Sequence, residues 1–155
     1  MLGRAVVAFL ALPGVVAIAV PVAIGFRARY RPQYVPLAIA LLIGGTFLLL
    51  WCVREFHVRG RGTLAPWAPP QRLVTTGPYR FSRNPMYLGV ITILLGWSAL
   101  WASPVLVAYT GVVLCAFHVR VILSEEPWAL HQFGAEWREY AARVPRWIMR
   151  FTQSR

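Results

Sequence analysis

Long apolar runs separated by short polar segments dominate the chain. Residues 5–25 carry no charge. As a helix rising about 1.5 Å per residue, they would extend about 31 Å, enough to cross the hydrocarbon core of a bilayer. Further apolar runs cover residues 35–53, 86–102 and 105–123. The pattern therefore predicts about four transmembrane helices, joined by a basic loop, a long polar loop over residues 54–83 and a short uncharged turn.

The first apolar run has a second interpretation, as a secretory signal. Arg4 precedes it, and Ala17-Ile18-Ala19 resembles a small-residue cleavage site. Because the apolar run continues past that site, a retained helix is favoured, kinked at Pro13 and Pro21. In the second run, Gly44-Gly45 offers a place where a neighbouring helix can approach closely.

A more polar segment near the end of the chain has helical periodicity. Over residues 127–144, apolar positions fall on one face of a helix and polar positions on the other. The apolar positions are Leu130, Phe133, Trp137, Tyr140, Ala141 and Val144. The segment is too polar to cross a membrane, so it is predicted to be one amphipathic helix in the interface, where Trp128 and Trp147 also fit. The predicted fold class is all-α: one domain over residues 1–155, built as a multi-pass membrane bundle.

Composition agrees with a membrane protein. Hydrophobic residues make up 58% of the chain, and its mean hydropathy is +0.56. The 16 basic residues are all arginines, the 5 acidic residues are all glutamates, and the formal net charge is +11. A nucleic-acid binder could share this balance, but here the arginines flank apolar runs. We therefore expect them to contact anionic lipid headgroups, and we do not expect nucleic acid as a partner.

The positions of the arginines predict the orientation of the bundle. The arginines of residues 54–83 and of the tail should face the cytoplasm, and the uncharged turn at Ser103-Pro104 should face away from it. An even number of spans in the cell membrane then places both termini inside. Arg27, Arg29 and Arg31 fall outside, which is the weak point of this topology.

The cysteines and histidines give little indication of a metal site. Cys52 and Cys115 lie in apolar runs and match no CxxC or Cys/His spacing, so both are predicted to be packing residues. The chain has 3 histidines and no aspartate. No metal is therefore expected.

Ionisable residues gather where the fourth run ends, at His118, Arg120, Glu125 and Glu126. A charge within a membrane helix costs about 2.5–3.5 kcal/mol, so such residues are functional candidates by default. Arg120 could instead extend to the interface, and His118 could be a hydrogen-bonded packing residue. At helical spacing, His118 would share a face with Ile122 and Glu125.

The glutamate pair needs a positive partner if the helix ends with the apolar run. Carboxylates at the C-terminal end of a helix face the negative end of its dipole. The partner could be an arginine such as Arg80 or Arg83, or the ammonium group of a ligand. Both arginines lie in residues 77–89, where Gly77-Pro78 and Asn84-Pro85 prevent one regular helix. Irregular backbone at membrane depth is tolerated only where it lines a cavity or is buried in protein, so this segment is predicted to form a reactive site.

Several motifs, in order, resemble those of one known family. They are Gly77-Pro78-Tyr79, Arg83-Asn84-Pro85-Met86-Tyr87-Leu88-Gly89, Glu125-Glu126, Phe133-Gly134-x-Glu136-Trp137-x-x-Tyr140 and Val144-Pro145-Arg146. The series lies within residues 63–148 and resembles the isoprenylcysteine carboxyl methyltransferase and phospholipid methyltransferase superfamily of membrane enzymes. Each motif alone is a weak signal, but the ordered set is a strong one.

The resemblance implies S-adenosylmethionine as the cofactor, in a pocket formed by the inner ends of the last two spans and the tail. By position, the resemblance assigns the cofactor to Tyr79, Arg83, Asn84, Tyr87, Glu125 and Glu126. Glu126 is the first choice for the methionine ammonium. The positions assigned to the substrate are His118, Tyr140 and Arg146. Arg146 could also contact the cofactor's carboxylate, or be an ordinary basic residue beside the membrane. Many members have histidine in place of Asn84, whose amide can hydrogen-bond but cannot titrate.

The residue types fit this cofactor, which offers a carboxylate, an ammonium, an adenine and a sulfonium to bind. The expected acceptor is a lipid or another amphiphile, and the sequence leaves its reacting group open. One alternative is a membrane reductase of the sterol type, which has a similar tail motif. Another is a four-helix small-molecule transporter, but such proteins usually place a carboxylate in the first span, and residues 5–25 contain none.

Overall fold

The computed structural model describes residues 10–28, 32–60 and 70–148, and every regular element within those ranges is a helix. The elements are η1 (Leu10–Ala19, π-helical), α2 (Val20–Ala28), α3 (Val35–Val58), η2 (Gly77–Arg80, a 3-10 helix), α4 (Pro85–Trp101), α5 (Pro104–Arg120), η3 (Val121–Glu125, π-helical), α6 (Glu126–Phe133) and α7 (Ala135–Arg143). The predicted all-α class is confirmed.

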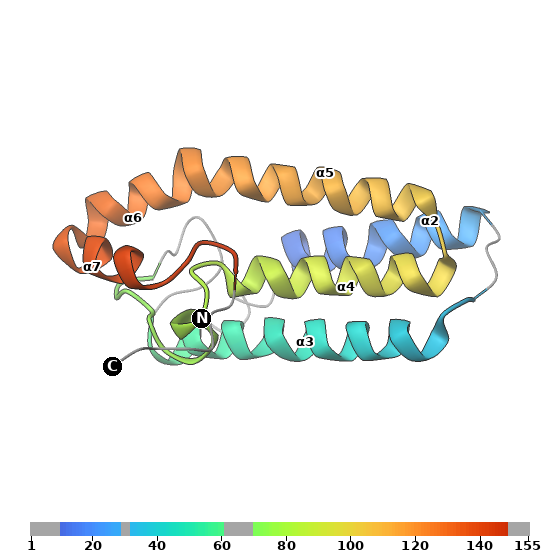
Figure 1. The fold of residues 1–155 in the computed structure, drawn as a ribbon, viewed down its shortest axis with the longest axis horizontal. Coiled ribbons are helices and arrows are strands. Elements are labelled where there is room, and N and C mark those ends of the chain that lie inside the picture. Colours follow the sequence, from blue (N-terminus) through green and yellow to red (C-terminus); the bar gives the residue numbers. More distant parts are fainter. Residues whose placement is uncertain (1–9, 29–31, 61–69, 149–155) are drawn as a thin grey trace.

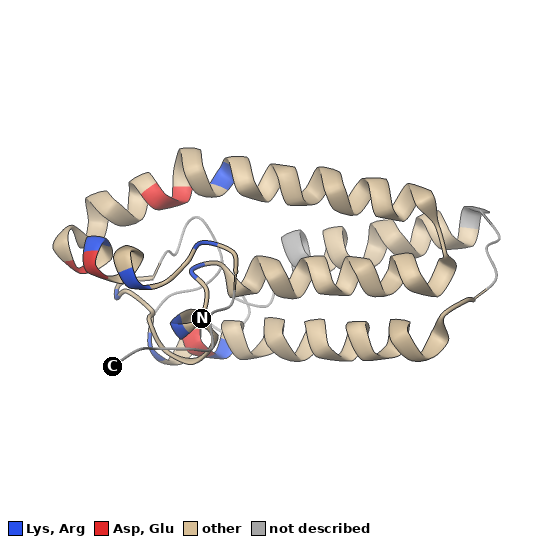
Figure 2. Ribbon diagram, viewed as in Figure 1, with Lys and Arg blue, Asp and Glu red and all other residues tan. Residues whose placement is uncertain are grey.

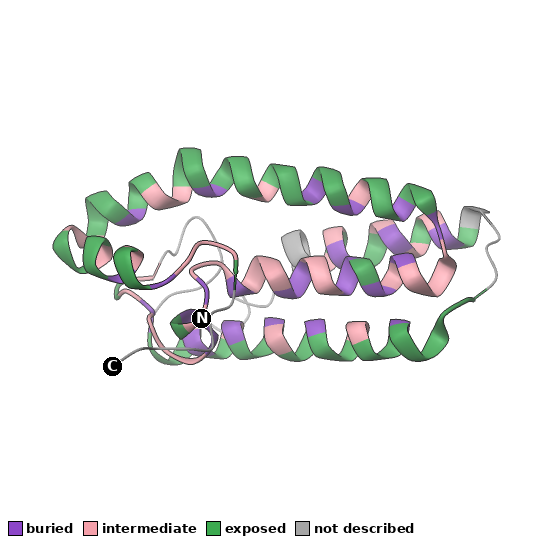
Figure 3. Ribbon diagram, in the orientation of Figure 1, coloured by how far each residue is buried: buried purple, intermediate pink, exposed green. Residues whose placement is uncertain are grey.

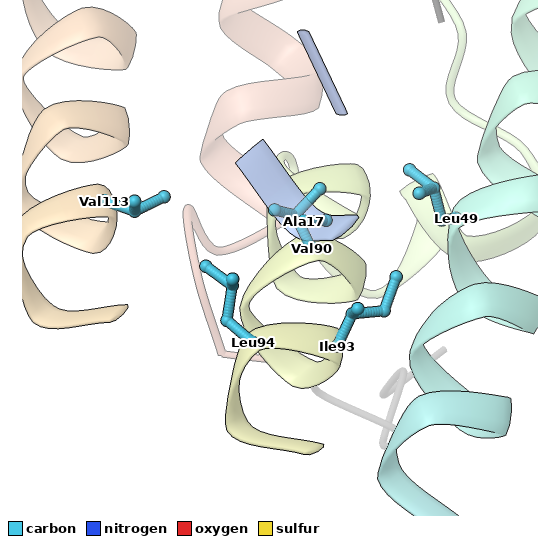
Figure 4. Packing of buried hydrophobic residues seen from close by; sticks show 6 residues of the cluster. All are labelled: Ala17, Leu49, Val90, Ile93, Leu94 and Val113. Carbon is cyan, nitrogen blue, oxygen red and sulfur yellow. The ribbon is translucent and has the colours of Figure 1, made fainter. Parts of the chain in front are cut away.

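Helix α4 lies at the centre of the bundle. It packs against α3 on one side and α5 on the other, and it also contacts η1 and α2 (Figure 1). Its residues Val90, Ile93 and Leu94 are at most 5% exposed and form one buried cluster with Ala17, Leu49 and Val113 (Figure 4). The cluster therefore packs η1, α3, α4 and α5 together, with α4 at its centre.

Helices α3 and α4 touch backbone to backbone at two glycines. A Cβ atom on Gly45 would lie 2.8 Å from the carbonyl oxygen of Gly89, and one on Gly89 would lie 3.1 Å from that of Gly45. Small residues allow such close approach between membrane helices. The expected role of the glycine pair in close approach is confirmed for Gly45. It is wrong for Gly44, where an added Cβ would meet nothing within 4 Å.

The outer surface of the bundle is apolar. Figure 3 shows that α3 and α5 expose most of their length and bury only one stripe each. Large side chains on the exposed stripes include Phe47, which is 65% exposed, and Val112, which is 67% exposed. An exposed apolar surface of this extent is typical of a protein surrounded by lipid.

Two helices of the described residues are long and apolar enough to cross a membrane. They are α3 and the continuous helix Pro104–Phe133, with mean hydropathies of 2.3 and 2.0 over their most apolar windows. Gly14–Phe26 and Pro85–Trp101 are apolar but shorter. The 17 residues of α4 would extend about 26 Å. The four predicted spans therefore require these shorter helices to cross as well.

The second predicted span ends later than expected. Helix α3 continues to Val58, beyond the predicted end at residue 53. The extra turn contains the charged residue Glu55. Glu55 forms ion pairs with Arg54 and Arg59, which offset the free-energy cost of removing its carboxylate from water. Within the predicted loop, residues 61–69 lie outside the described part of the chain. So do Arg29, Arg31 and the side chain of Arg27, on which the weak point of the predicted topology rests, and Arg4.

The helix that contains the fourth predicted span does not end at residue 123. The helix continues through η3 into α6 and ends at Phe133. A π-helical turn has hydrogen bonds of wider spacing than an α-helix, so it leaves room for Pro127, which lacks an N–H, at the start of α6. The glutamate pair therefore lies within a continuous helix, and the prediction that it follows a helix C-terminus is wrong. The extra residue of the π turn also shifts the register that was expected to align His118 with Glu125.

The single amphipathic helix predicted over residues 127–144 is also wrong. The segment forms two helices, α6 and α7, separated by Gly134, which has φ 53° and ψ −116°. A residue with a Cβ atom rarely adopts this conformation, so glycine permits the sharp bend between them. The predicted apolar face is buried only towards its end, at Tyr140 and Val144, whereas Leu130 is 39% exposed.

Candidate functional site

The charged residues whose side chains the structure describes gather at one end of the bundle, and the described middle of the helices is uncharged (Figure 2). This end contains η2, the start of α4, the η3–α6 junction and the segment after α7. Gly77, with φ 59°, starts η2, and Pro85 is the first residue of α4. Between them, the backbone N–H of Asn84 donates to Ser82 Oγ at 3.2 Å. Of the segment 77–89, which was predicted to be irregular, residues 77–84 lie outside any α-helix, and α4 begins at Pro85.

Glu126 is bound by two arginines from different parts of the chain. Arg146 donates from Nε and Nη2 to the two carboxylate oxygens, each at 2.8 Å. Arg83 Nη1 lies 3.0 Å from Glu126 Oε1. The side chains of Arg83, Glu126 and Arg146 are 14%, 18% and 33% exposed, so this cluster is largely shielded from water. The bidentate bond is the strong form of arginine–carboxylate pairing, and it raises the pKa of Arg146.

Arg83 retains an unused donor. Its Nε atom is buried and has no hydrogen-bond partner among the described residues. Its guanidinium also lies 5.8 Å from the centre of the Trp137 ring, a cation–π contact. Arg83 is thus one of the cationic partners expected for the glutamate pair. Arg80, the other candidate, instead lies over the Phe81 ring at 5.7 Å.

Glu125 forms a second, more exposed group. Its Oε1 atom accepts hydrogen bonds from the Tyr87 hydroxyl and from Arg120 Nε, the latter at 2.7 Å. Arg120, which could have extended alone to the interface, therefore has an acidic partner. The two neighbouring glutamates bind separate sets of partners, and both sets include a residue of the 77–89 segment.

The segment after α7 is fastened across the start of α4. The backbone N–H of Arg83 donates to the carbonyl of Pro145 at 2.9 Å. Ser82 Oγ and Asn84 Nδ2 both donate to the carbonyl of Arg146, at 3.2 and 3.1 Å. The side-chain amide of Asn84 thus holds the tail through a neutral hydrogen bond. This contact does not require a side chain that can titrate.

Aromatic rings flank the ion pairs. Tyr87 stacks on Phe117 with ring centres 4.2 Å apart, and it also lies 6.4 Å from Trp147. The indole N–H of Trp147 donates to His118 Nδ1 at 3.0 Å. His118 is therefore hydrogen-bonded, and it lies at the surface against the tail.

Tyr79 and Tyr140 lie deeper in the protein. The Tyr140 hydroxyl donates to the carbonyl of Tyr79 at 2.8 Å. Tyr79 packs with Cys52 and Val74, and its ring centre lies 5.3 Å from that of Phe56. Burial raises the pKa of both tyrosines, so both stay protonated at neutral pH. Apart from this hydrogen bond with Tyr140, the contacts named here for Tyr79 are with α3 and the preceding loop, and none is with the charged cluster.

Glu55 is a buried acid that the sequence reasoning did not single out. It is 4% exposed, accepts a hydrogen bond from Thr76 Oγ1 at 2.6 Å and lies 3.0 Å from Arg59 Nε. A Cβ atom on Gly77 would lie 2.9 Å from Glu55 Cγ, so glycine is required there on steric grounds too. The available signal was a lone carboxylate in the last turn of an apolar helix.

Both cysteines are free thiols; Cys52 is buried, as expected of a packing residue, but Cys115 is exposed. Within the described residues there is no group of three or more His, Cys, Asp or Glu side chains that could hold a metal ion.

Comparison with known proteins gives one family match. Residues 34–136 match the family described as phospholipid methyltransferase. Among individual proteins, the chain is 34% identical over 74 residues to protein-S-isoprenylcysteine O-methyltransferase B of Arabidopsis thaliana, covering 48% of this chain and 38% of that protein. It is 36% identical to methanethiol S-methyltransferase 1 of Bradyrhizobium diazoefficiens, over 50% of this chain and 26% of that protein.

A third relative has a different activity in its name. The chain is 28% identical to the Delta(14)-sterol reductase TM7SF2 of Mus musculus, over 75% of this chain and 31% of that protein. The chain spans less than half the length of each of these three relatives. No solved structure matches the chain.

Proposed function

Because the chain belongs to the phospholipid methyltransferase family, we propose that it is an integral membrane methyltransferase that transfers a methyl group from S-adenosylmethionine to a lipid-like or other amphiphilic acceptor. Two of the relatives are named as methyltransferases, one acting on protein-S-isoprenylcysteine and one on methanethiol. The apolar outer surface is consistent with a substrate that arrives from the membrane.

The observation that carries the proposal is the cluster of Arg83, Glu126 and Arg146. It unites three of the motifs at one point, although they lie far apart in the sequence. Two guanidinium groups share a single carboxylate, so the cluster has one positive charge in excess. An amino-acid group presents a carboxylate and an ammonium side by side. The excess arginine charge suits the carboxylate, and Glu126 suits the ammonium.

The cofactor fits the neighbouring residues as well. The buried Nε atom of Arg83 offers a donor that lacks a partner among the described residues. The rings of Tyr87, Phe117 and Trp147 provide an aromatic wall suited to an adenine or to a cationic sulfur. We therefore assign cofactor binding to Arg83, Glu126 and Tyr87, with Arg146 as a further contact.

When bound, S-adenosylmethionine would supply a methyl group activated by its positively charged sulfur, and S-adenosylhomocysteine would be left after transfer. The protein's part is then alignment of the acceptor and exclusion of water. Asn84 and Ser82 hold the tail over the start of α4, which keeps Arg146 and Trp147 in place. Where the acceptor must lose a proton, Glu125 is the candidate base, because it is adjacent to Glu126 in the chain and Tyr87 donates to it.

Two other functions make different predictions. The similarity to a sterol reductase makes a reductase the second candidate function. Such an enzyme would bind a nicotinamide cofactor in preference to an adenosyl ligand. A transporter would bind neither with a defined stoichiometry. Among the described residues of the first apolar run, 10–25, none is acidic, which favours an enzyme over a transporter of that type.

Substitution of Glu126 tests the proposed site directly. Glu126→Gln keeps the size of the side chain and removes the charge that would bind an ammonium. We expect binding of S-adenosylhomocysteine to weaken by about 1.5–3 kcal/mol, the value of a charge-assisted hydrogen bond, as measured by calorimetry on detergent-purified protein.

The matched control is Glu139→Gln. Glu139 is 72% exposed and pairs with Arg143 on the surface of α7, so its substitution should leave affinity unchanged. Equal affinity of the wild-type protein and Glu126→Gln, with circular dichroism showing both folded, would remove Glu126 from this role.

A further inference from the structure

A second polar site lies at the charged end of the bundle. An open cavity of about 570 Å³ is lined by the end of α3, the loop of residues 71–76 and residues of α6 and α7. None of the residues that line it belongs to the Arg83–Glu126–Arg146 cluster. Its volume falls within the range of about 300–1,000 Å³ that is typical of small-molecule sites.

The lining of this cavity is rich in hydrogen-bond donors. Arg59 and Arg72 contribute two guanidinium groups, and Gln71 and Thr75 contribute an amide and a hydroxyl. Glu136 is the one acidic residue in the described lining, and Glu55, which pairs with Arg59, lies outside it. The donors of the lining outnumber its acidic groups, a composition that favours an anion.

Much of this donor capacity is unused. The Arg72 guanidinium has neither an ion pair nor a hydrogen bond with the described residues, and the same holds for the side chains of Gln71 and Thr75. Arg59 binds Glu55 through Nε at 3.0 Å, which leaves its two terminal nitrogens without a described partner. The backbone holds the loop in place, because the N–H groups of Gln71 and Arg72 both donate to the carbonyl of Gly60, at 2.9 and 3.3 Å.

We propose that this cavity binds a phosphate group, carried either by the headgroup of a membrane lipid or by a soluble phosphomonoester. Arg59, directly after α3, and residues of the 71–76 loop both contribute donors to the lining, and a phosphate has enough acceptor oxygens to bond to several donors at once. A planar carboxylate has only two. The cavity is larger than a phosphate alone, so it also has room for the glycerol or other group that carries it. This site does not depend on methyl transfer by the other cluster.

The test measures binding of two probes to the detergent-purified full chain. The soluble probe is glycerol 3-phosphate, and the lipid probe is a short-chain phosphatidylglycerol, each titrated by calorimetry. Arg72→Gln should weaken binding by about tenfold, because it removes a charged donor. Glu136→Gln should strengthen binding, because it removes the one negative charge of the lining. Arg143→Gln, an exposed arginine on α7 outside the lining, should change nothing.

The opposite signs of the first two effects distinguish a specific site from general attraction to a basic protein. Binding of glycerol 3-phosphate with this pattern would identify a soluble phosphate as the ligand, and binding of the lipid probe alone with the same pattern would identify a lipid headgroup. Absence of binding by both probes would overturn the proposal. So would binding that Arg72→Gln and Arg143→Gln weaken equally, or that Glu136→Gln leaves unchanged. Thermal unfolding of each variant confirms that it is folded.

Discussion

Glu126 holds one negative charge between two arginines. One arginine would suffice to neutralise it, and burying a second guanidinium carries a desolvation cost. Because the Arg83 side chain is only 14% exposed, hydration of its guanidinium offsets little of that desolvation cost. An anionic group of a ligand would offset it, which is the physical reason for placing a carboxylate-bearing cofactor here. From the sequence, a cationic partner for the glutamate pair could be predicted, and Arg83 was one of those considered. The bidentate contact with Arg146 could not, because it depends on the path of the tail.

Glu55 organises the loop that precedes the site. Its carboxylate accepts a hydrogen bond from the hydroxyl of Thr76 and forms an ion pair with Arg59, and the residue is almost fully buried. We expect Glu55→Gln to lower the free energy of unfolding by about 1.5–3 kcal/mol, because a charged hydrogen-bond acceptor is lost and Arg59 loses its partner. Thermal unfolding in detergent measures this.

The control for Glu55 is the exposed Glu139→Gln variant, whose midpoint should match that of the wild-type protein. Thr76→Val, which leaves the carboxylate without its hydroxyl partner, should also destabilise. A Glu55→Gln variant as stable as Glu139→Gln would mean that the charge of Glu55 contributes nothing to the loop.

The buried tyrosines predict alkaline instability. Burial raises the pKa of Tyr140 above its ordinary value of 10.0, more than the charge of Arg83 lowers it. Above pH 10 the unfolded chain loses this proton while the folded protein retains it, so stability falls as pH rises. Below that pH the contribution is fully present. In Tyr140→Phe, the fall in unfolding free energy above pH 10 should be less steep, as measured by denaturant unfolding across a pH series.

Tyr34→Phe, which removes the hydroxyl of an exposed tyrosine, is the matched control for this slope. An alkaline slope that is identical in wild-type protein and Tyr140→Phe would exclude Tyr140 as its source.

At the scale of elements, the position of α4 depends on its contact with α3. Gly45 and Gly89 allow the two backbones to touch, and a methyl group at Gly45 would lie 2.8 Å from a carbonyl oxygen that cannot move aside. Gly45→Ala should therefore lower the unfolding free energy by about 1–3 kcal/mol. Gly44→Ala is the control, since it points into open space and should be neutral or stabilising by up to about 1 kcal/mol. Equal melting midpoints for the two variants would contradict this packing.

The elements show where sequence reasoning succeeds and where it fails. Apolar runs gave α3, α4 and α5 with their starts correct to within about one residue, because hydropathy and proline position report directly on such helices. The end of the fourth helix was missed because a π turn, which no periodicity signals, carries the chain past Pro127. The division at Gly134 was missed because glycine is compatible with a continuous helix and with a bend alike.

At the scale of the whole molecule, the long uncharged helices bring distant motifs to one end. Residues 77–89 and Glu126 are joined through α4, the turn at Ser103, α5 and η3, so the chain runs along the bundle and returns to the end at which α4 begins. Ser103 caps α5 by accepting a hydrogen bond from the N–H of Leu106 at 3.3 Å. The uncharged hairpin could be predicted from the sequence. The partners of Glu126 at the other end of the hairpin could not be predicted from the sequence, because they depend on the reach of the side chains and on the path of the tail.

The central claim is that this charged end binds an adenosyl cofactor. Calorimetric titration of S-adenosylhomocysteine into the detergent-purified wild-type protein, with NADPH titrated under the same conditions, tests it most directly. We expect saturable binding of S-adenosylhomocysteine with one site per chain and no saturable binding of NADPH. Absence of binding by S-adenosylhomocysteine, or saturable binding of NADPH alone, would contradict it.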